Sequence, residues 1–208
     1  PEAGSEALRR RINKPLDEAE FLEIVEQVAR AGWRTVKMYF MIGLPGETDD
    51  DLDGIVRIVE AAIARVRDAG IGRLDVNVTL SPFVPKPHTP FQWEAQASPD
   101  EIRRRMNHVR DRLPRKGVAV KTSPIASSRL EAALARGDRR VVDVIEAAWR
   151  GGCRFDGWSE NFRPELWWKA FEDCGLDPAW YASRPRGDDE TLPWDHIASG
   201  PGKAFLAR

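Results

Sequence analysis

Thr35-Val-Lys-Met-Tyr-Phe-Met-Ile-Gly-Leu-Pro-Gly-Glu-Thr48 is the stretch that decides the fold. Its first half is apolar and rich in β-forming residues, and it ends abruptly at Gly43-Leu-Pro-Gly46. Acidic residues follow, and then a long helical pattern begins, so this order predicts a strand, a tight turn and a helix N-terminus. Ligands of α/β folds bind where strands end and helices begin. We therefore expect Gly43, Pro45 and Gly46 to lie beside a ligand, although a tight turn with no ligand would have the same glycines.

The pattern on both sides of this stretch alternates between helix and strand. Helical periodicity covers 16–31, 50–69 and 98–116, and strand-like runs cover 35–42, 73–81 and 118–122. Short connections between such elements are typical of parallel βα units. The fold class is therefore predicted to be α/β with a parallel sheet, and 35–42 should be covered by helices. A complete barrel needs more strands, so the sheet is either open or the second part of a barrel.

A different pattern begins after Thr122, where the chain becomes mostly helical and rich in tryptophan. We predict one domain over 1–122 and a helical extension over 123–208. Ser128 is expected to cap a helix that ends near Arg136. A second helix over 138–150 is expected to bury Val141, Val142, Ile145 and Trp149, and the tryptophans are interpreted as core anchors.

Composition places the protein among ordinary globular chains. The sequence is 42% hydrophobic and 31% charged, with a net charge of −1, which argues against a nucleic-acid-coating surface. No apolar run is long enough to span a membrane. Two cysteines, Cys153 and Cys174, are too few for a disulfide scaffold, so a reducing, cytoplasmic location is predicted.

Three segments, in this order, resemble the later half of a radical S-adenosylmethionine (SAM) enzyme core. They are Pro1-Glu-Ala-Gly-Ser-Glu-Ala-Leu-Arg9, Phe40-Met-Ile-Gly-Leu-Pro-Gly-Glu-Thr48 and Ser81-Pro-Phe-Val-Pro-Lys-Pro-His-Thr-Pro90. The extension is similar to that of uncharacterised radical SAM proteins that have a cobalamin (B12)-binding-type domain. The similar segments there are Arg136-Gly-Asp-Arg-Arg140, Phe155-Asp-Gly-Trp158 and Leu192-Pro-Trp-Asp-His-Ile197.

The resemblance implies a partial TIM-type (βα) barrel whose site lies at the carboxyl ends of the strands. It implies a [4Fe–4S] cluster, SAM as cofactor and radical chemistry on an unknown substrate; cobalamin is a further cofactor by analogy. Cofactor-binding residues would be Glu2, Ser5, Lys37, Met41, Gly43, Pro45 and Gly46. Substrate-side residues would be Phe83, Lys86 and His88.

The chain departs from the family at the cluster motif. The three closely spaced cysteines that hold such a cluster are absent, so no metal ligand and no catalytic residue is predicted here. The chain is interpreted as a fragment whose partners are the missing N-terminal half, which would carry the cluster ligands, and an unknown substrate. No membrane partner is expected.

Several of these residues have simpler interpretations. Glu2 and Ser5 fit a capping loop, and His88 fits an exposed loop. Lys37 would meet a carboxylate or ligand, or extend its amine to the rim. Asp49 to Asp51 are expected to be helix caps, and His108 is expected to be exposed.

A second function is compatible with the sequence. The chain could be a non-catalytic binding module that contacts RNA or a protein partner. The contacts would come from the arginine-bearing helix (Arg103 to Arg112) and the Pro-rich loop 81–90.

Overall fold

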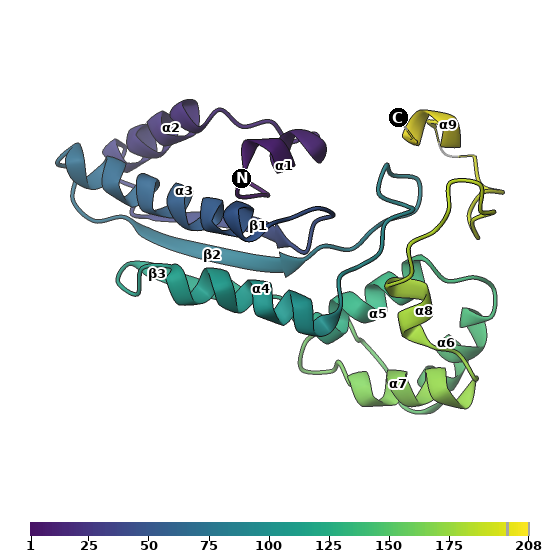
Figure 1. Ribbon diagram of the computed structural model, residues 1–208. Coiled ribbons are helices and arrows are strands. Elements are labelled where there is room, and N and C mark those ends of the chain that lie inside the picture. Colours follow the sequence, from purple (N-terminus) through teal and green to yellow (C-terminus); the bar gives the residue numbers. More distant parts are fainter. Residues whose placement is uncertain (199, 208) are drawn as a thin grey trace. The chain divides into compact units, whose positions relative to one another are not determined.

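A computed structural model describes residues 1–198 and 200–207 (Figure 1). The elements follow in the order α1 (Glu6–Arg11), α2 (Glu18–Arg30), β1 (Thr35–Ile42), α3 (Asp49–Asp68), β2 (Asp75–Pro82), α4 (Pro99–Arg112), β3 (Val118–Thr122), α5 (Ile125–Ala135), α6 (Val141–Arg150), α7 (Pro164–Asp173), α8 (Pro178–Ala182) and α9 (Lys203–Leu206). The predicted α/β class is confirmed.

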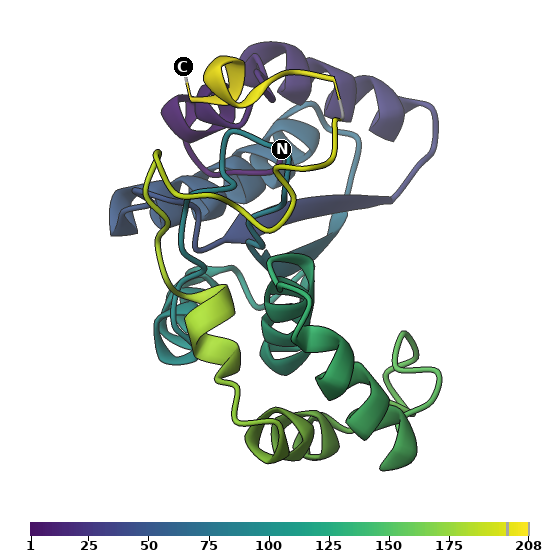
Figure 2. The ribbon, with the colours of Figure 1, turned by 90° about the vertical axis from the view of Figure 1, so that its right-hand side faces the viewer.

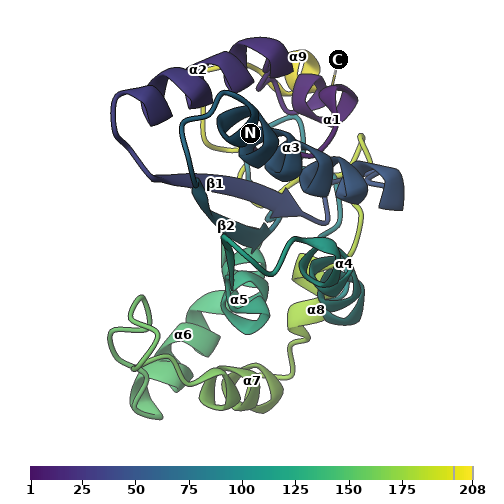
Figure 3. The ribbon, with the colours of Figure 1, turned by 90° about the vertical axis from the view of Figure 1, so that its left-hand side faces the viewer.

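The three strands form one parallel sheet in the order β1-β2-β3. Phe40 lies opposite Leu80, and Leu80 lies opposite Thr122. The crossovers through α3 and α4 are expected to be right-handed, which places both helices on the same face of the sheet. Figure 1 shows α3 and α4 on the near side of the strands, and Figure 3 shows the same arrangement from one side.

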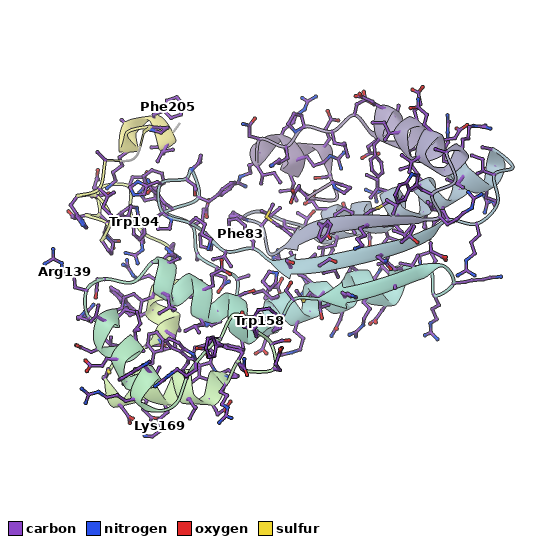
Figure 4. The ribbon with its side chains drawn as sticks, turned by 180° about the vertical axis from the view of Figure 1, so that it is seen from behind. Phe83, Arg139, Trp158, Lys169, Trp194 and Phe205 are labelled. Carbon is purple, nitrogen blue, oxygen red and sulfur yellow. The ribbon has the colours of Figure 1, made fainter. Side chains whose placement is uncertain are left out.

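The two faces of this sheet differ in burial. The face toward α3 and α4 is buried and apolar, and its side chains are Met38, Phe40, Ile42, Val76, Val78 and Leu80. The opposite face, called here the open face, is exposed or half-buried and mostly polar (Figure 4). The open face consists of Lys37, Tyr39, Met41, Asn77, Thr79, Ser81, Ala119 and Lys121. The expectation that helices cover β1 on both faces is therefore wrong.

The chain divides into two compact units. Unit 1 is Pro1–Phe83 with Asp100–Ser123, and unit 2 is Val84–Pro99 with Pro124–Arg208. The division predicted at Thr122 placed Val84–Pro99 with the first part. In the structure the segment packs in unit 2, where the Gln96 N–H donates to Ala182 O (2.9 Å) and Trp194 Nε1 donates to Gln92 Oε1 (2.7 Å).

Unit 2 has its own core, formed where α5, α6, α7 and α8 pack together (Figure 2). The helix expected to start at Ser128 begins earlier, at Ile125, and Ser128 is buried inside it. The expected core face of α6 is correct at Val141 and wrong at the other three positions. Val142, Ile145 and Trp149 are 62%, 46% and 56% exposed. The buried residues of α6 are Val141, Val144 and Ala148.

The tryptophans are only partly the core anchors that the sequence suggested. In the extension Trp167 and Trp194 are buried, whereas Trp149, Trp158 and Trp180 are exposed. Of the helices in the described ranges, none combines the length and apolar character that a membrane-spanning segment requires.

Candidate ligand site at the carboxyl end of strand β1

The turn that follows β1 depends on its two glycines. Gly43 has a φ of 88° and Gly46 a φ of 75°, a region that side chains with a Cβ rarely adopt. The turn is closed by the Glu47 N–H, which donates to Leu44 O (3.0 Å). A Cβ at Gly46 would lie 2.9 Å from Arg11 Nη1, which donates to Pro45 O (2.8 Å). Any residue other than glycine would therefore strain the backbone at Gly43 or Gly46, and a side chain at Gly46 would also meet Arg11.

A buried carboxylate holds the turn from inside. The Glu47 side chain is 2% exposed, and its Oε2 accepts the Gly43 N–H (2.7 Å) and Arg105 Nη1 (3.0 Å). Burial raises the pKa of Glu47 above its usual value, and these two hydrogen bonds oppose that rise. Glu47 thus fixes the position of the first turn glycine and connects it to α4.

The contact to α4 continues as a chain of ion pairs. Arg105 Nε donates to Glu101 Oε1 (2.6 Å), which also accepts Arg104 Nη2 (2.9 Å). These two arginines, Arg104 first, lower the pKa of Glu101 to about 2. Arg104 Nη1 reaches Asp49 Oδ1 (3.0 Å) in the first turn of α3. Arg104 and Arg105 of α4 therefore form ion pairs with the carboxylates around the β1 turn.

The acidic start of α3 behaves as a helix cap. Thr48 Oγ1 accepts the Asp51 N–H (3.3 Å), and Asp51 Oδ2 accepts the Thr48 N–H (2.8 Å), which is a reciprocal capping box. Asp53 of the same helix hydrogen-bonds His108 Nε2 (2.7 Å). His108 is only 10% exposed, so its expected exposure is wrong, and it joins α4 to α3.

The N-terminal segment lies along the edge of β1. The Glu2 N–H donates to Tyr39 O (2.9 Å), and the Met41 N–H donates to Glu2 O (2.8 Å). This parallel bridge holds Glu2 at a φ of 71°. The structure therefore brings Glu2 and Met41 together, just before the turn glycines.

A close backbone approach fixes the same segment to α3. A Cβ at Gly4 would lie 1.9 Å from Asp51 O, and one at Gly54 would lie 2.3 Å from Gly4 O. Arg9 is fully buried and donates to Ala3 O (3.2 Å), Gly4 O (3.3 Å) and Glu18 Oε1 (2.6 Å). Glycine is therefore needed at positions 4 and 54, where the N-terminal segment crosses α3.

Ser5 has the structural role that the simpler interpretation expected. Its Oγ accepts the Leu8 N–H (3.2 Å) and caps α1. A hydrogen bond from Ser5 also helps to lower the pKa of Asp51 against the effect of burial, which is the largest influence on that carboxyl group. Ser5 thus lies beside the start of α3 and serves two helix N-termini.

Lys37 lies away from the turn. It is six residues before Gly43 on β1, which corresponds to about 20 Å along an extended strand. Its side chain is exposed on the open face and has no ion-pair partner among the described residues. The structure therefore places Lys37 on the same face as Met41 but does not bring it to the carboxyl edge of the sheet.

The three substrate-side residues do not form one group. Phe83 is buried in unit 1, and its N–H donates to Ile42 O (2.8 Å). Lys86 and His88 belong to unit 2, where Lys86 pairs with Glu131. His88, at a φ of 57°, lines a cavity of about 390 Å³ together with Asp195 and Lys203.

Asp195 belongs to a hydrogen-bonded corner of the extension. Its carboxylate accepts the Leu192 N–H (2.8 Å) and Lys203 Nζ (3.2 Å). These contacts give Asp195 a structural role. They fix the residues that carry one wall of the His88 cavity.

The sequence did not identify Glu47, Arg105, Arg9 or Arg11 as site residues. The one available signal was a carboxylate directly after the turn glycines, at Glu47. Arg11 and Arg105 carried no signal because Pro45 and Glu47, which they contact, lie 34 and 58 residues away in the chain. Among the described residues, no group of three His, Cys, Asp or Glu side chains could hold a metal ion, and both cysteines are free.

Comparison with known proteins finds an uncharacterized protein of the archaeon Methanocaldococcus jannaschii. It is 30% identical over 146 residues, which are 70% of this chain and 31% of the relative, so the chain spans less than a third of that protein. No protein-family model matches the chain, and no solved structure matches it significantly. These comparisons supply no activity, so function has to be inferred from the residues themselves.

Proposed function

We propose that this chain is part of a radical SAM enzyme and that SAM binds at the carboxyl end of β1. The observation that carries the proposal is the meeting of two segments of the resemblance at this edge. Glu2 bridges to β1 beside Met41, two residues before Gly43. An exposed polar face and a glycine turn at a strand end are typical of ligand sites in α/β folds.

In this proposal each group at the edge has a definite task. Tyr39, which is 55% exposed, and Met41 offer apolar surface of the kind that adenine prefers. Backbone groups of the turn lie close enough to a ligand because Gly43 and Gly46 have no side chain. Glu47 and Arg105 position the turn and do not contact the ligand. Three parallel strands with one open face are compatible with part of a barrel, which we propose is completed by other strands.

The residues present do not fit an iron–sulfur cluster. Cys153 and Cys174 both lie in unit 2, and no third cysteine exists. A cluster needs several thiolates at close range. We therefore propose that the cluster ligands lie outside these 208 residues. The substrate, and any use of cobalamin, remain predictions from the resemblance.

The alternative of an RNA-binding module gains little from the arginines of α4. Arg104 and Arg105 already bind Glu101, Asp49 and Glu47, so they are neutralised within unit 1. Phosphate contacts need cations that are free to replace counterions. We therefore propose that the chain acts as part of an enzyme and not as an RNA-binding module.

The test is production of 5′-deoxyadenosine from SAM by the complete protein, reduced anaerobically after reconstitution with iron and sulfide. In the Gly43→Val variant we expect at least a tenfold lower yield, because a β-branched residue at a φ of 88° would distort the turn. Gly32→Val is the matched control. Gly32 has a φ of 99°, lies between α2 and β1 and has no atom within 4 Å of an added Cβ.

The control variant carries similar backbone strain but should keep the activity of the wild type per folded molecule. No 5′-deoxyadenosine from wild-type protein with an occupied cluster would refute the proposed function. Equal losses in the two variants would remove the β1 turn from the SAM site.

A further inference from the structure

Unit 2 contains an arginine cluster that is held together mainly by backbone carbonyls. The cluster consists of Arg136, Arg184 and Arg186. Arg136 is fully buried and donates to Ala182 O (2.8 Å) and Arg184 O (3.1 Å), and Arg186 Nη2 donates to Arg136 O (2.8 Å). These bonds hold the guanidinium groups of Arg136 and Arg186 through neutral carbonyl oxygens, and they bring the backbone of Arg184 beside Arg136.

Among the described residues, Glu190 is the carboxylate that pairs with this cluster, and it contacts two of the three arginines. Glu190 accepts Arg184 Nη2 (2.6 Å) and lies 3.5 Å from Arg186 Nη1, whereas Arg136 pairs with no carboxylate among the described residues. The Nε atoms of all three arginines are buried without a hydrogen-bond partner. Desolvation, and then the charges of Arg186 and Arg184, lower the pKa of Arg136 to about 10. The cluster therefore carries excess positive charge in a poorly hydrated environment.

A cavity of about 410 Å³ opens beside this cluster. Its lining includes Arg186, whose side chain is 2% exposed, and Glu190, and it includes Arg139, Trp180, Thr191 and His196. Arg139 is exposed, forms no ion pair within 1–198 and 200–207, and projects outward from the loop between α5 and α6 (Figure 4). The volume is in the range of small-molecule sites, which run from about 300 to 1,000 Å³.

The other carboxylates that line the cavity are already paired. Asp138 binds Arg140 Nη2 (2.6 Å), and Asp195 binds Lys203 Nζ (3.2 Å). Of the arginines that line the cavity, Arg139 therefore has no ion pair among the described residues, and Arg186 shares Glu190 with Arg184. Thr191 and His196 provide polar groups at the cavity wall.

We propose that this cavity binds a ligand through a phosphate group, at a site separate from the proposed SAM site. Guanidinium groups match phosphate oxygens in charge and in the spacing of their donors. A bound phosphate would place negative charge beside Arg139 and Arg186, the arginines that line the cavity. The phosphate can belong to free inorganic phosphate or to an organic phosphomonoester of nucleotide size, which the cavity volume admits.

The experiment is calorimetric titration of the 208-residue chain at constant ionic strength. The probes are inorganic phosphate, adenosine monophosphate and adenosine. We expect saturable binding of both phosphates and none of adenosine. Tighter binding of the nucleotide would identify an organic phosphomonoester as the source, and equal affinities would identify phosphate itself as the ligand.

Two matched variants locate the site. Arg139→Gln should weaken phosphate binding about tenfold, the usual scale for one charge-assisted contact. Arg163→Gln removes the same charge from an exposed residue of the same unit outside the cavity, and it should change the affinity less than twofold. Both side chains are exposed and have no ion pair with any residue that the structure describes, so both variants should keep the wild-type melting temperature.

Two outcomes would overturn the proposal. One is the absence of saturable phosphate binding by the folded wild-type chain. The other is an equal loss of affinity in Arg139→Gln and Arg163→Gln, which would indicate general attraction to a charged surface. Neither outcome depends on SAM or on a cluster, so a failure here is distinct from a failure of the proposed enzymatic function.

Discussion

Glu47 determines the geometry of the β1 turn through a single oxygen. That oxygen accepts one backbone N–H from Gly43 and one N–H from Arg105, so it joins the end of β1 to α4, the third element after β1 in the chain. A buried donor that loses its acceptor keeps the full cost of its desolvation. The carboxylate is therefore expected to stabilise unit 1 even though its own burial is unfavourable.

Replacing Glu47 by alanine should lower the free energy of unfolding by about 2–3 kcal/mol. The change leaves the Gly43 N–H and one Arg105 N–H without an acceptor. Urea denaturation measures the loss. Glu60→Ala is the control, because Glu60 lies on the exposed side of α3 and has no partner among the described residues, and it should change stability by less than about 0.5 kcal/mol. Equal effects would show that the Glu47 contacts contribute nothing.

At the scale of elements, α6 shows that the periodicity of apolar residues does not determine which face of a helix is buried. Its sequence has two adjacent apolar stripes, Val142–Ile145–Trp149 and Val141–Val144–Ala148. Side-chain size favours the first stripe as the buried one. The second is buried because the smaller Ala148 lets α6 approach the core around α7. Only the partner surface decides between the stripes, and that surface is not encoded in the helix itself.

Two tryptophans on neighbouring helices give opposite predictions. Trp167→Ala should cost about 3–5 kcal/mol, because Trp167 is 7% exposed, packs in the unit 2 core and donates to Asp156 (3.2 Å). Trp149→Ala should cost no more than about 1 kcal/mol, because Trp149 is 56% exposed and its one ring contact is the Arg154 guanidinium at 4.6 Å. Thermal denaturation of both variants checks this, and a larger loss for Trp149 would contradict the observed burial.

Elements were easier to predict from sequence than contacts. The bounds of β1 and β3 match the predicted 35–42 and 118–122, since local composition and turn residues set them. The helix predicted over 16–31 is also present as α2, where the Asp17 side chain caps the first turn and accepts the Glu20 N–H (3.0 Å). The position of Val84–Pro99 in unit 2 could not be predicted, because its partners lie between 32 and 102 residues away in the chain, as with Gln96 and Ser128 or Gln92 and Trp194.

At the scale of the whole molecule, each unit contains a carboxylate with an unusually low pKa. Arginine hydrogen bonds lower the pKa to about 2 at Glu101 in unit 1 and at Glu190 in unit 2. In the unfolded chain each would titrate near 4.5. Between these values the unfolded state binds more protons than the folded state. The stability that these groups provide above pH 4.5 is therefore lost as the pH falls toward 2.

Glu190→Gln isolates the contribution of unit 2. Between pH 5 and pH 2 the wild type should lose about 1–2 kcal/mol more stability than the variant, a value reduced from the full pKa shift because the side chain is partly exposed to solvent. Urea unfolding at several pH values gives this difference. Asp188→Asn serves as the control, since Asp188 is exposed and unpaired among the described residues and should leave the wild-type pH dependence unchanged.

The chain passes between its two units at 83–84, at 99–100 and at 123–124. This interleaving has a consequence for synthesis on the ribosome, where the N-terminal part of a chain emerges first. Unit 1 has all its residues available once Ser123 has emerged, but Val84–Pro99 then lacks its later partners until Ala182 and Trp194 are made. The prolines of this segment restrict its backbone during that interval, which lowers the entropy lost when it finally docks.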